Sequence, residues 1–198
     1  MKRKLLYILC LFAYKITFSQ NTNEINRSLK ISDSLTFNKE LRIYQLASST
    51  NYSSVFRIYQ EKDKKWTIEY FKFYKSFDKN KNDRFEKFVL SSKTNLDIFW
   101  FKILDTDIVN LPQWDKISYK FKKRGKIVYD NSEYVLMQNR TQVLDGNSYI
   151  VSIKNFDSMN SVNYGNPESY FKLFPKVDEL ESFMKLLTLI RKEFKDYK

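Results

Sequence analysis

Alternating hydrophobic and polar positions dominate the first half of the chain and predict β-strands. Residues 41–44, 55–59 and 66–70 alternate in this way, and a polar turn separates the last two segments. A period of two places successive side chains on opposite faces of a sheet. We therefore expect a hairpin across this turn, followed by a further short strand at residues 85–90.

Hydrophobic residues recur at helical spacing in two later segments. The first covers residues 96–104, directly after Thr94-Asn95-Leu96-Asp97, which is similar to a capping box. The second covers about residues 177–195, and its acidic start and basic end match the helix dipole. Asn166-Pro167-Glu168 has the composition of a helix start and predicts a short helix.

Residues 117–155 return to a strand pattern. Arg124-Gly125 and Asp145-Gly146 lie between apolar runs, so we expect hairpin turns there. Runs of strands with separated helices favour the α+β class. The sequence predicts a single α+β domain with a mainly antiparallel sheet, one mid-chain helix and a C-terminal amphipathic helix packed on that sheet.

The N-terminus has the layout of a secretory signal peptide. Three basic residues at positions 2–4 precede ten apolar residues, and the small residue Ser19 stands before the expected cleavage point. A membrane-spanning helix needs about 20 apolar residues, and Lys15 ends this run too early. We therefore expect a secreted or periplasmic protein with no integral membrane span after cleavage.

The sequence divides into three parts, the first of which would be removed by cleavage after residue 19. Residues 1–19 form the signal peptide, and residues 20–36 form a polar lead-in that could be flexible. Residues 37–198 form the α+β globular domain. We see no internal repeat and no low-complexity linker within that last part.

Composition excludes several catalytic classes. The 198 residues include 35 Lys and Arg, 23 Asp and Glu, one Cys and no His, with a net charge of +12. Without imidazole there is no Ser-His-Asp or Cys-His catalytic set and no histidine metal ligand. Three glycines cannot build a glycine-rich phosphate loop. The sequence predicts no cofactor and no metal site.

A basic segment at residues 116–126 is the first candidate for binding, because it carries six cations and no anion. If residues 117–123 form a strand, its cations line one solvent face and could bind an anionic polymer. The candidate residues are Lys120, Lys122, Lys123, Arg124 and Lys126. The alternative is a solvated strand whose lysines protect a sheet edge from pairing.

Two other features suggest contacts with a sugar or a peptide. Trp114 follows Pro112 in an expected loop, where it could offer an aromatic surface, although tryptophan more often belongs to the core. Asp105 and Asp107 place two carboxylates near a helix end, and glycoside hydrolases need only two carboxyl groups. The polarity of an ordinary helix surface is the more common explanation for two such aspartates.

These observations favour an exported, non-catalytic binding or interaction protein. Its partner would be a protein or a glycan of the cell envelope. One alternative is a carboxylate-dependent glycan hydrolase. The other is a binder of anionic polymers that uses the basic segment as a hairpin.

Overall fold

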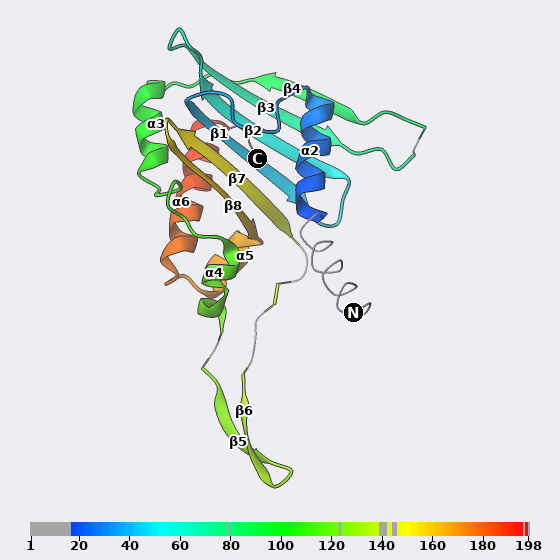
Figure 1. Ribbon diagram of the computed structural model, residues 1–198, viewed down its shortest axis with the longest axis vertical. Coiled ribbons are helices and arrows are strands. Elements are labelled where there is room, and N and C mark those ends of the chain that lie inside the picture. The colour runs from blue at the N-terminus through cyan, green and yellow to red at the C-terminus, as the bar shows by residue number, and fades with distance from the viewer. Residues whose placement is uncertain are drawn as a thin grey trace, which may run out of the picture.

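The computed structural model describes residues 17–197 apart from 79, 123, 139–141, 144, 145 and 196, and it describes side chains from Thr22 onward. Six strands form one antiparallel sheet in the order β4-β3-β2-β1-β7-β8 (Figure 1). These strands are β1 (Lys39–Ala47), β2 (Tyr52–Gln60), β3 (Trp66–Tyr74), β4 (Arg84–Val89), β7 (Asn147–Asn155) and β8 (Ser158–Gly165). The described residues thus confirm the α+β class with antiparallel strands.

Helices lie on both faces of this sheet (Figure 1). In chain order they are α2 (Thr17–Leu29), α3 (Leu96–Leu104), α4 (Trp114–Ile117), α5 (Pro167–Leu173) and α6 (Asp178–Glu193), and a 3-10 turn, η1 (Ser118–Phe121), follows α4. The sequence predicted one mid-chain helix, whereas the structure has both α3 and α4 there. None of the described helices is long and apolar enough to cross a membrane.

The larger hydrophobic core lies between the sheet and helices α3 and α6. Helix α6 buries five side chains, which are Leu180, Phe183, Leu186, Leu187 and Ile190. The ring of Phe183 stacks on Tyr164 of β8 with centroids 4.5 Å apart. The predicted C-terminal amphipathic helix therefore covers one face of the sheet.

Helix α2 covers part of the opposite face. Its Ile25 and Leu29 are buried against strand residues that include Val55 and Phe71. The sequence predicted a polar lead-in here because these hydrophobic residues are isolated among polar ones. Helix α2 begins at Thr17, so the predicted cleavage after residue 19 would fall within its first turn. The cleavage itself remains a prediction.

The strand predicted at residues 117–123 is wrong, because α4 and η1 occupy residues 114–121. Ile117 and Phe121 are both buried, whereas Tyr119 is 63 % exposed. A spacing of four residues places Ile117 and Phe121 on one helical face. The same spacing also fits the two-residue period of a β-strand, which the sequence predicted.

The hairpin in this region comes later in the chain and consists of β5 (Lys126–Asp130) and β6 (Glu133–Met137). Its turn lies at Asn131-Ser132, where both residues have positive φ, and not at Arg124-Gly125 as predicted. Asp145 of the other predicted turn lies outside the described residues.

Candidate functional site

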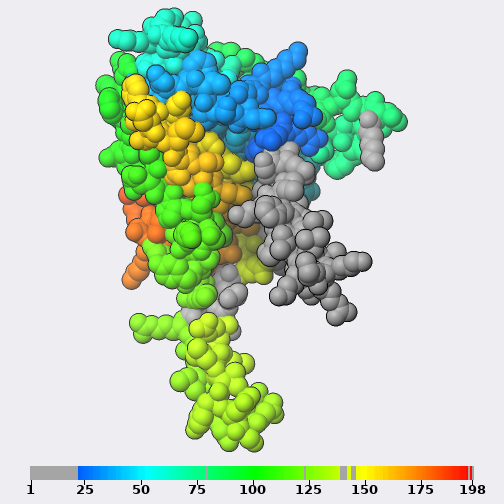
Figure 2. All heavy atoms as spheres, viewed as in Figure 1, coloured from blue at the N-terminus to red at the C-terminus, as the bar shows by residue number. Residues whose placement is uncertain are grey.

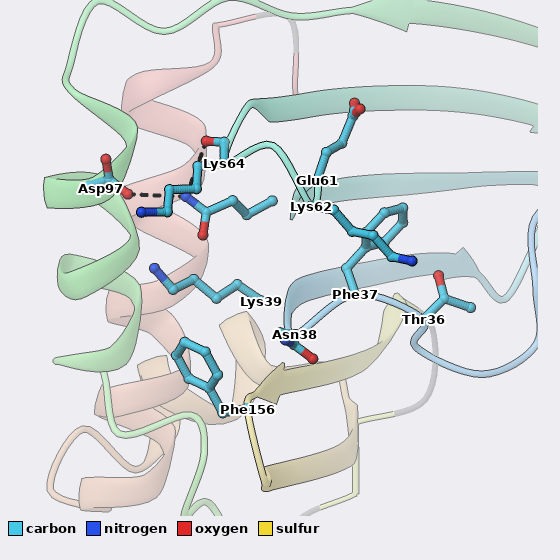
Figure 3. Close-up of a pocket in the computed structure, with 10 residues that line it drawn as sticks. Thr36, Phe37, Asn38, Lys39, Glu61, Lys62, Lys64, Asp97 and Phe156 are labelled. Atoms are coloured by element: carbon cyan, nitrogen blue, oxygen red, sulfur yellow. Dashed lines mark hydrogen bonds between the residues drawn. The ribbon is translucent and has the colours of Figure 1, made fainter.

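A pocket of about 690 Å³ opens at one corner of the sheet (Figure 3). It is lined by residues 36–39 at the start of β1, residues 60–62 and 64 at the end of β2 and in the β2–β3 turn, Asp97 of α3 and Phe156 of the β7–β8 turn. Antiparallel pairing of β1 with both β2 and β7 brings these strand ends together. The pocket therefore gathers side chains that are far apart in the sequence.

A buried carboxylate fixes the wall of the pocket that precedes β1. Oε2 of Glu40 accepts hydrogen bonds from the backbone N–H groups of Thr36 (2.8 Å) and Phe37 (3.1 Å). Oε1 of Glu40 accepts from Nε of Arg42 (2.7 Å) and from Nε of Arg57 (2.9 Å). Because Glu40 and Arg42 are at most 1 % exposed, this arrangement is part of the core of the fold.

Charges alternate across the neighbouring strands. Arg57 of β2 lies 3.3 Å from Glu69 of β3, and Nζ of Lys87 in β4 lies 2.6 Å from the same carboxylate. The guanidinium of Arg57 also lies 4.3 Å from the centroid of the Tyr59 ring, on which Phe37 stacks at 4.2 Å. These charged residues fix Arg57 against Tyr59, and Tyr59 in turn holds the aromatic ring of Phe37 beside the pocket.

Lys39 places a cation between two aromatic rings of the site. Its Nζ lies 5.5 Å from the ring centroid of Trp66 and 5.8 Å from that of Phe156. Nε1 of Trp66 donates a hydrogen bond of 3.1 Å to Oδ1 of Asp97, which anchors the indole to α3. Such cation–π contacts orient the ammonium group and leave its hydrogen-bond donors free for other partners.

The pocket has more available cations than anions. Lys39, Lys62 and Lys64 make no ion pair with any described residue. The two carboxylates of the pocket already accept hydrogen bonds, Glu61 from Oγ1 of Thr67 (2.7 Å) and Asp97 from Trp66. An anionic group entering the pocket would therefore find lysines that have no carboxylate partner among the described residues.

Phe156 adopts a strained backbone conformation at this pocket. Its φ is +54°, although its side chain is 55 % exposed and no burial requires it there. A left-handed conformation costs a non-glycine residue about 1–2 kcal/mol, and such strain tends to gather at functional sites. The backbone N–H of Phe156 donates to the carbonyl of Asn38 (2.7 Å), which holds the turn against the start of β1.

Replacing Phe156 with Asn should raise the free energy of unfolding by about 1 kcal/mol, because Asn tolerates positive φ far better than Phe. Urea denaturation measures this change. Phe77→Asn is the matched control, since Phe77 is 88 % exposed and its φ is not positive. Equal effects of the two substitutions would show that the turn stores no such strain.

The structure does not assemble the predicted row of cations. Nζ of Lys120 donates to Oδ1 of Asp178 (2.8 Å) and to Glu179 (2.7 Å), which ties η1 to the start of α6. These hydrogen bonds raise the pKa of Lys120 and lower the pKa of Asp178 to about 2. Lys120 therefore has a structural partner and does not line up with the cations that follow it.

The other predicted cations lie at the base of the β5–β6 hairpin. Lys122, Arg124 and Lys126 are exposed there and make no ion pair with a described residue. Lys123, the remaining member of the predicted set, lies outside the described residues.

Trp114 belongs to an aromatic cluster and offers no free platform. Its ring centroid lies 4.7 Å from that of Phe121, 5.3 Å from Tyr164 and 4.9 Å from Tyr170. It is partly buried against the larger core. The structure thus favours the core role over the exposed role that the sequence left open.

The aspartates near the end of α3 form local turn contacts. Asp105 is the C-terminal cap residue of the helix, and Oδ1 of Asp107 accepts a hydrogen bond of 2.7 Å from Asn110. Among the described residues, no group of three or more Cys, Asp or Glu is arranged to hold a metal ion.

Comparison of the chain with models of protein families, with curated proteins and with solved structures finds no match. The pocket is consequently interpreted from its own geometry and charge.

Proposed function

We propose that the protein is an exported, non-catalytic binding domain whose pocket takes an acidic glycan of the cell envelope. The observation that carries this proposal is the combination of Lys39, Lys62 and Lys64, which make no ion pair with a described residue, and the rings of Phe37 and Phe156 around one pocket. The signal-like N-terminus supports a location outside the cytosol.

The chemistry of the pocket fits a sugar that carries a carboxylate or a sulfate. Aromatic rings offer flat apolar surfaces for the C–H faces of a pyranose, and lysines attract its acidic group as mobile point charges. Phosphate groups commonly bind at helix N-termini. Here the N-terminus of α3 presents Asp97 and is capped by Asn95, whose side chain accepts from the backbone N–H groups. These features disfavour a nucleotide phosphate at that position.

The test is calorimetric titration of the protein with an acidic oligomer, either an oligogalacturonate or a sulfated galactose oligomer, and with a neutral galactose oligomer of the same length. We expect binding of the acidic oligomer only. Changing Lys39, Lys62 and Lys64 together to Gln should weaken this binding by about 30-fold, equivalent to about 2 kcal/mol. The matched control changes the exposed Lys116, Lys172 and Lys192 to Gln, which lowers the net charge equally outside the pocket.

Three results would overturn the proposal. Equal binding of the neutral oligomer would remove the role of charge. Equal weakening by both triple variants would indicate nonspecific attraction to a basic protein. Absence of binding to uronate and sulfated oligomers alike would reject an acidic glycan as the ligand.

The same pocket also bears on the hydrolase alternative, because Glu61 and Asp97 both line it. Paired carboxylates are sufficient for glycoside hydrolysis. Steady release of reducing ends from the oligomer, lost in both Glu61→Gln and Asp97→Asn, would replace the binding role with an enzymatic one. We expect the oligomer to be recovered intact.

A further inference from the structure

The pocket at the corner of the sheet adjoins a second hollow. This hollow has a volume of about 510 Å³ and is lined by Phe37, Tyr59, Glu61, Lys62 and Asp63. Three of these residues, Phe37, Glu61 and Lys62, also line the pocket of about 690 Å³ described above. Both volumes lie within the range of about 300–1,000 Å³ that is typical of ligand pockets. We treat the two hollows as a larger and a smaller compartment of one site, because they share this wall.

The ring of Phe37 forms the aromatic part of the shared wall. It is half-buried and stacks on Tyr59 with 4.2 Å between the ring centroids and 21° between the ring planes. The guanidinium of Arg57 lies 4.3 Å from the centroid of the Tyr59 ring, and Nε of Arg57 lies 2.9 Å from the buried carboxylate of Glu40. The position of Phe37 is therefore fixed from below. A ligand that occupies both compartments has to cross a rigid aromatic surface.

Charges outside the shared wall differ in sign between the two compartments. The larger compartment adds the cations of Lys39 and Lys64 and the carboxylate of Asp97, whereas the smaller one adds only the carboxylate of Asp63. Asp63 accepts a hydrogen bond of 3.1 Å from the backbone N–H of Lys65 and makes no ion pair with a described residue. An acidic group is therefore attracted to the larger compartment and repelled from the smaller one.

The smaller compartment is open to solvent. Figure 2 shows the β2–β3 turn, in cyan, at the opposite end of the molecule from the β5–β6 hairpin. Lys62, Asp63 and Lys64 of this turn are all exposed. A chain of sugars can therefore reach both compartments from outside without displacing another described segment.

Resting on the proposed binding of an acidic glycan, we propose that the site recognises two adjoining sugar units of different charge. The acidic unit lies beside Lys39 and Lys64, the uncharged unit lies beside Asp63, and Phe37 separates them. A second acidic unit is disfavoured, because its charge would lie well within the Debye length of about 8 Å from Asp63. The ligand is thus a heteropolysaccharide in which acidic and neutral sugars are neighbours, and not a homopolymer of uronates.

Three disaccharides that differ in a single carboxylate test this preference by calorimetric titration. They are digalacturonate and the two disaccharides of galacturonate with galactose, one in each order. At an ionic strength of about 0.15 M, one of the mixed disaccharides should bind about fivefold more tightly than digalacturonate, the effect of one like charge at an exposed site.

Asp63→Asn should abolish this preference. The substitution removes the charge and keeps a side-chain oxygen that can accept from the N–H of Lys65, so the turn is retained. Asp115→Asn is the matched control, because Asp115 is an exposed carboxylate outside both compartments. This control should leave the fivefold preference unchanged.

Phe37→Leu tests whether the ligand crosses the aromatic wall. Tethering makes the binding of the second unit intramolecular, so the better mixed disaccharide should bind at least about tenfold more tightly than galacturonate alone. Phe37→Leu keeps an apolar side chain but removes the aromatic ring, and it should reduce this gain to about threefold or less. Phe77→Leu, at a ring that is 88 % exposed outside both compartments, should leave the gain at its native value.

The outcomes separate this inference from the function on which it rests. Digalacturonate that binds as tightly as both mixed disaccharides, or a preference that survives Asp63→Asn, would contradict the charge assignment and leave an acidic glycan as the ligand. Binding of longer acidic oligomers without binding of any disaccharide, or a gain unaffected by Phe37→Leu, would contradict the two-unit site in the same way. If no acidic oligomer of any length binds, the proposed function fails and this inference fails with it.

Discussion

Glu40→Ala should lower the free energy of unfolding by about 3–5 kcal/mol, the effect of removing one partner from a buried ion-pair network. The substitution leaves the guanidinium groups of Arg42 and Arg57 without the carboxylate that lies within 3 Å of both. It also removes the acceptor for the backbone N–H groups of Thr36 and Phe37. Urea denaturation at pH 7 measures the change.

An exposed ion pair provides the control for this prediction. Glu181 contacts Lys185 at 2.9 Å on the surface of α6, where both side chains are at least half exposed. Glu181→Ala should change the free energy of unfolding by less than about 1 kcal/mol. Similar losses in the two variants would mean that the buried network contributes no particular stability.

The same network gives stability a defined dependence on pH. Burial raises the pKa of Glu40, but attraction to Arg57 and Arg42, together with hydrogen bonds, lowers it below 4.5. The unfolded chain therefore binds this proton more readily than the folded chain does. The stabilisation is complete above pH 4.5 and is lost as the pH falls through the pKa of the folded state. The difference in the free energy of unfolding between the native protein and Glu40→Ala should therefore become smaller as the pH falls below 4.5.

The elements that the sequence predicted correctly have long and unambiguous patterns. The helix expected at residues 96–104 is α3, and its N-terminal cap is Asn95 within the segment that was similar to a capping box. The predicted helix near residues 177–195 contains α6, whose five buried residues recur at helical spacing. The hairpin of β2 and β3 follows from clear alternation on both sides of a polar turn.

The basic segment was misassigned because its hydrophobic residues fit both the helical period and the strand period. Helix α4 and η1 bury Ile117 and Phe121, and a strand would have placed the same two residues on one face. Glycine was also a misleading signal for the turn. Gly125 lies at the base of the β5–β6 hairpin, where an added Cβ would be 2.8 Å from Cδ1 of Leu136. A Cβ at this position would have to displace the exposed side chain of Leu136, so close packing and not a turn accounts for the glycine, while Asn131-Ser132 makes the turn.

The pocket could not be predicted from the sequence because strand register assembles it. Lys39, Asp97 and Phe156 belong to three distant segments, and no local motif links them. One signal was available, since Phe156 stands between Asn155 and Asp157, two residues typical of turns. An aromatic residue at such a position indicates exposure, but only the pairing of β1 with β7 places it beside Lys39.

Ile25→Ala should lower the free energy of unfolding by about 2–5 kcal/mol, the range for truncating a fully buried isoleucine. Ile25 has no exposed surface and packs with Leu29 against the sheet. The next residue, Asn26, accepts a hydrogen bond of 2.7 Å from the hydroxyl of Tyr44 and donates one of 3.0 Å to Asp33. A flexible lead-in would have neither contact. A large loss of stability therefore supports helix α2, and a small loss supports the flexible lead-in that the sequence predicted.

Arg27→Ala is the matched control, because Arg27 lies in the same helix and its side chain is exposed. Alanine favours the helical backbone at both positions, so any difference between the two variants reports the contact with the sheet and not the propensity of α2. We expect Arg27→Ala to stay within about 0.5 kcal/mol of the native protein. Both variants should be made in a chain that begins at residue 20, the first residue after the predicted cleavage. If only Ile25→Ala then loses several kcal/mol of unfolding free energy, the residues that remain after cleavage still hold the helix on the sheet.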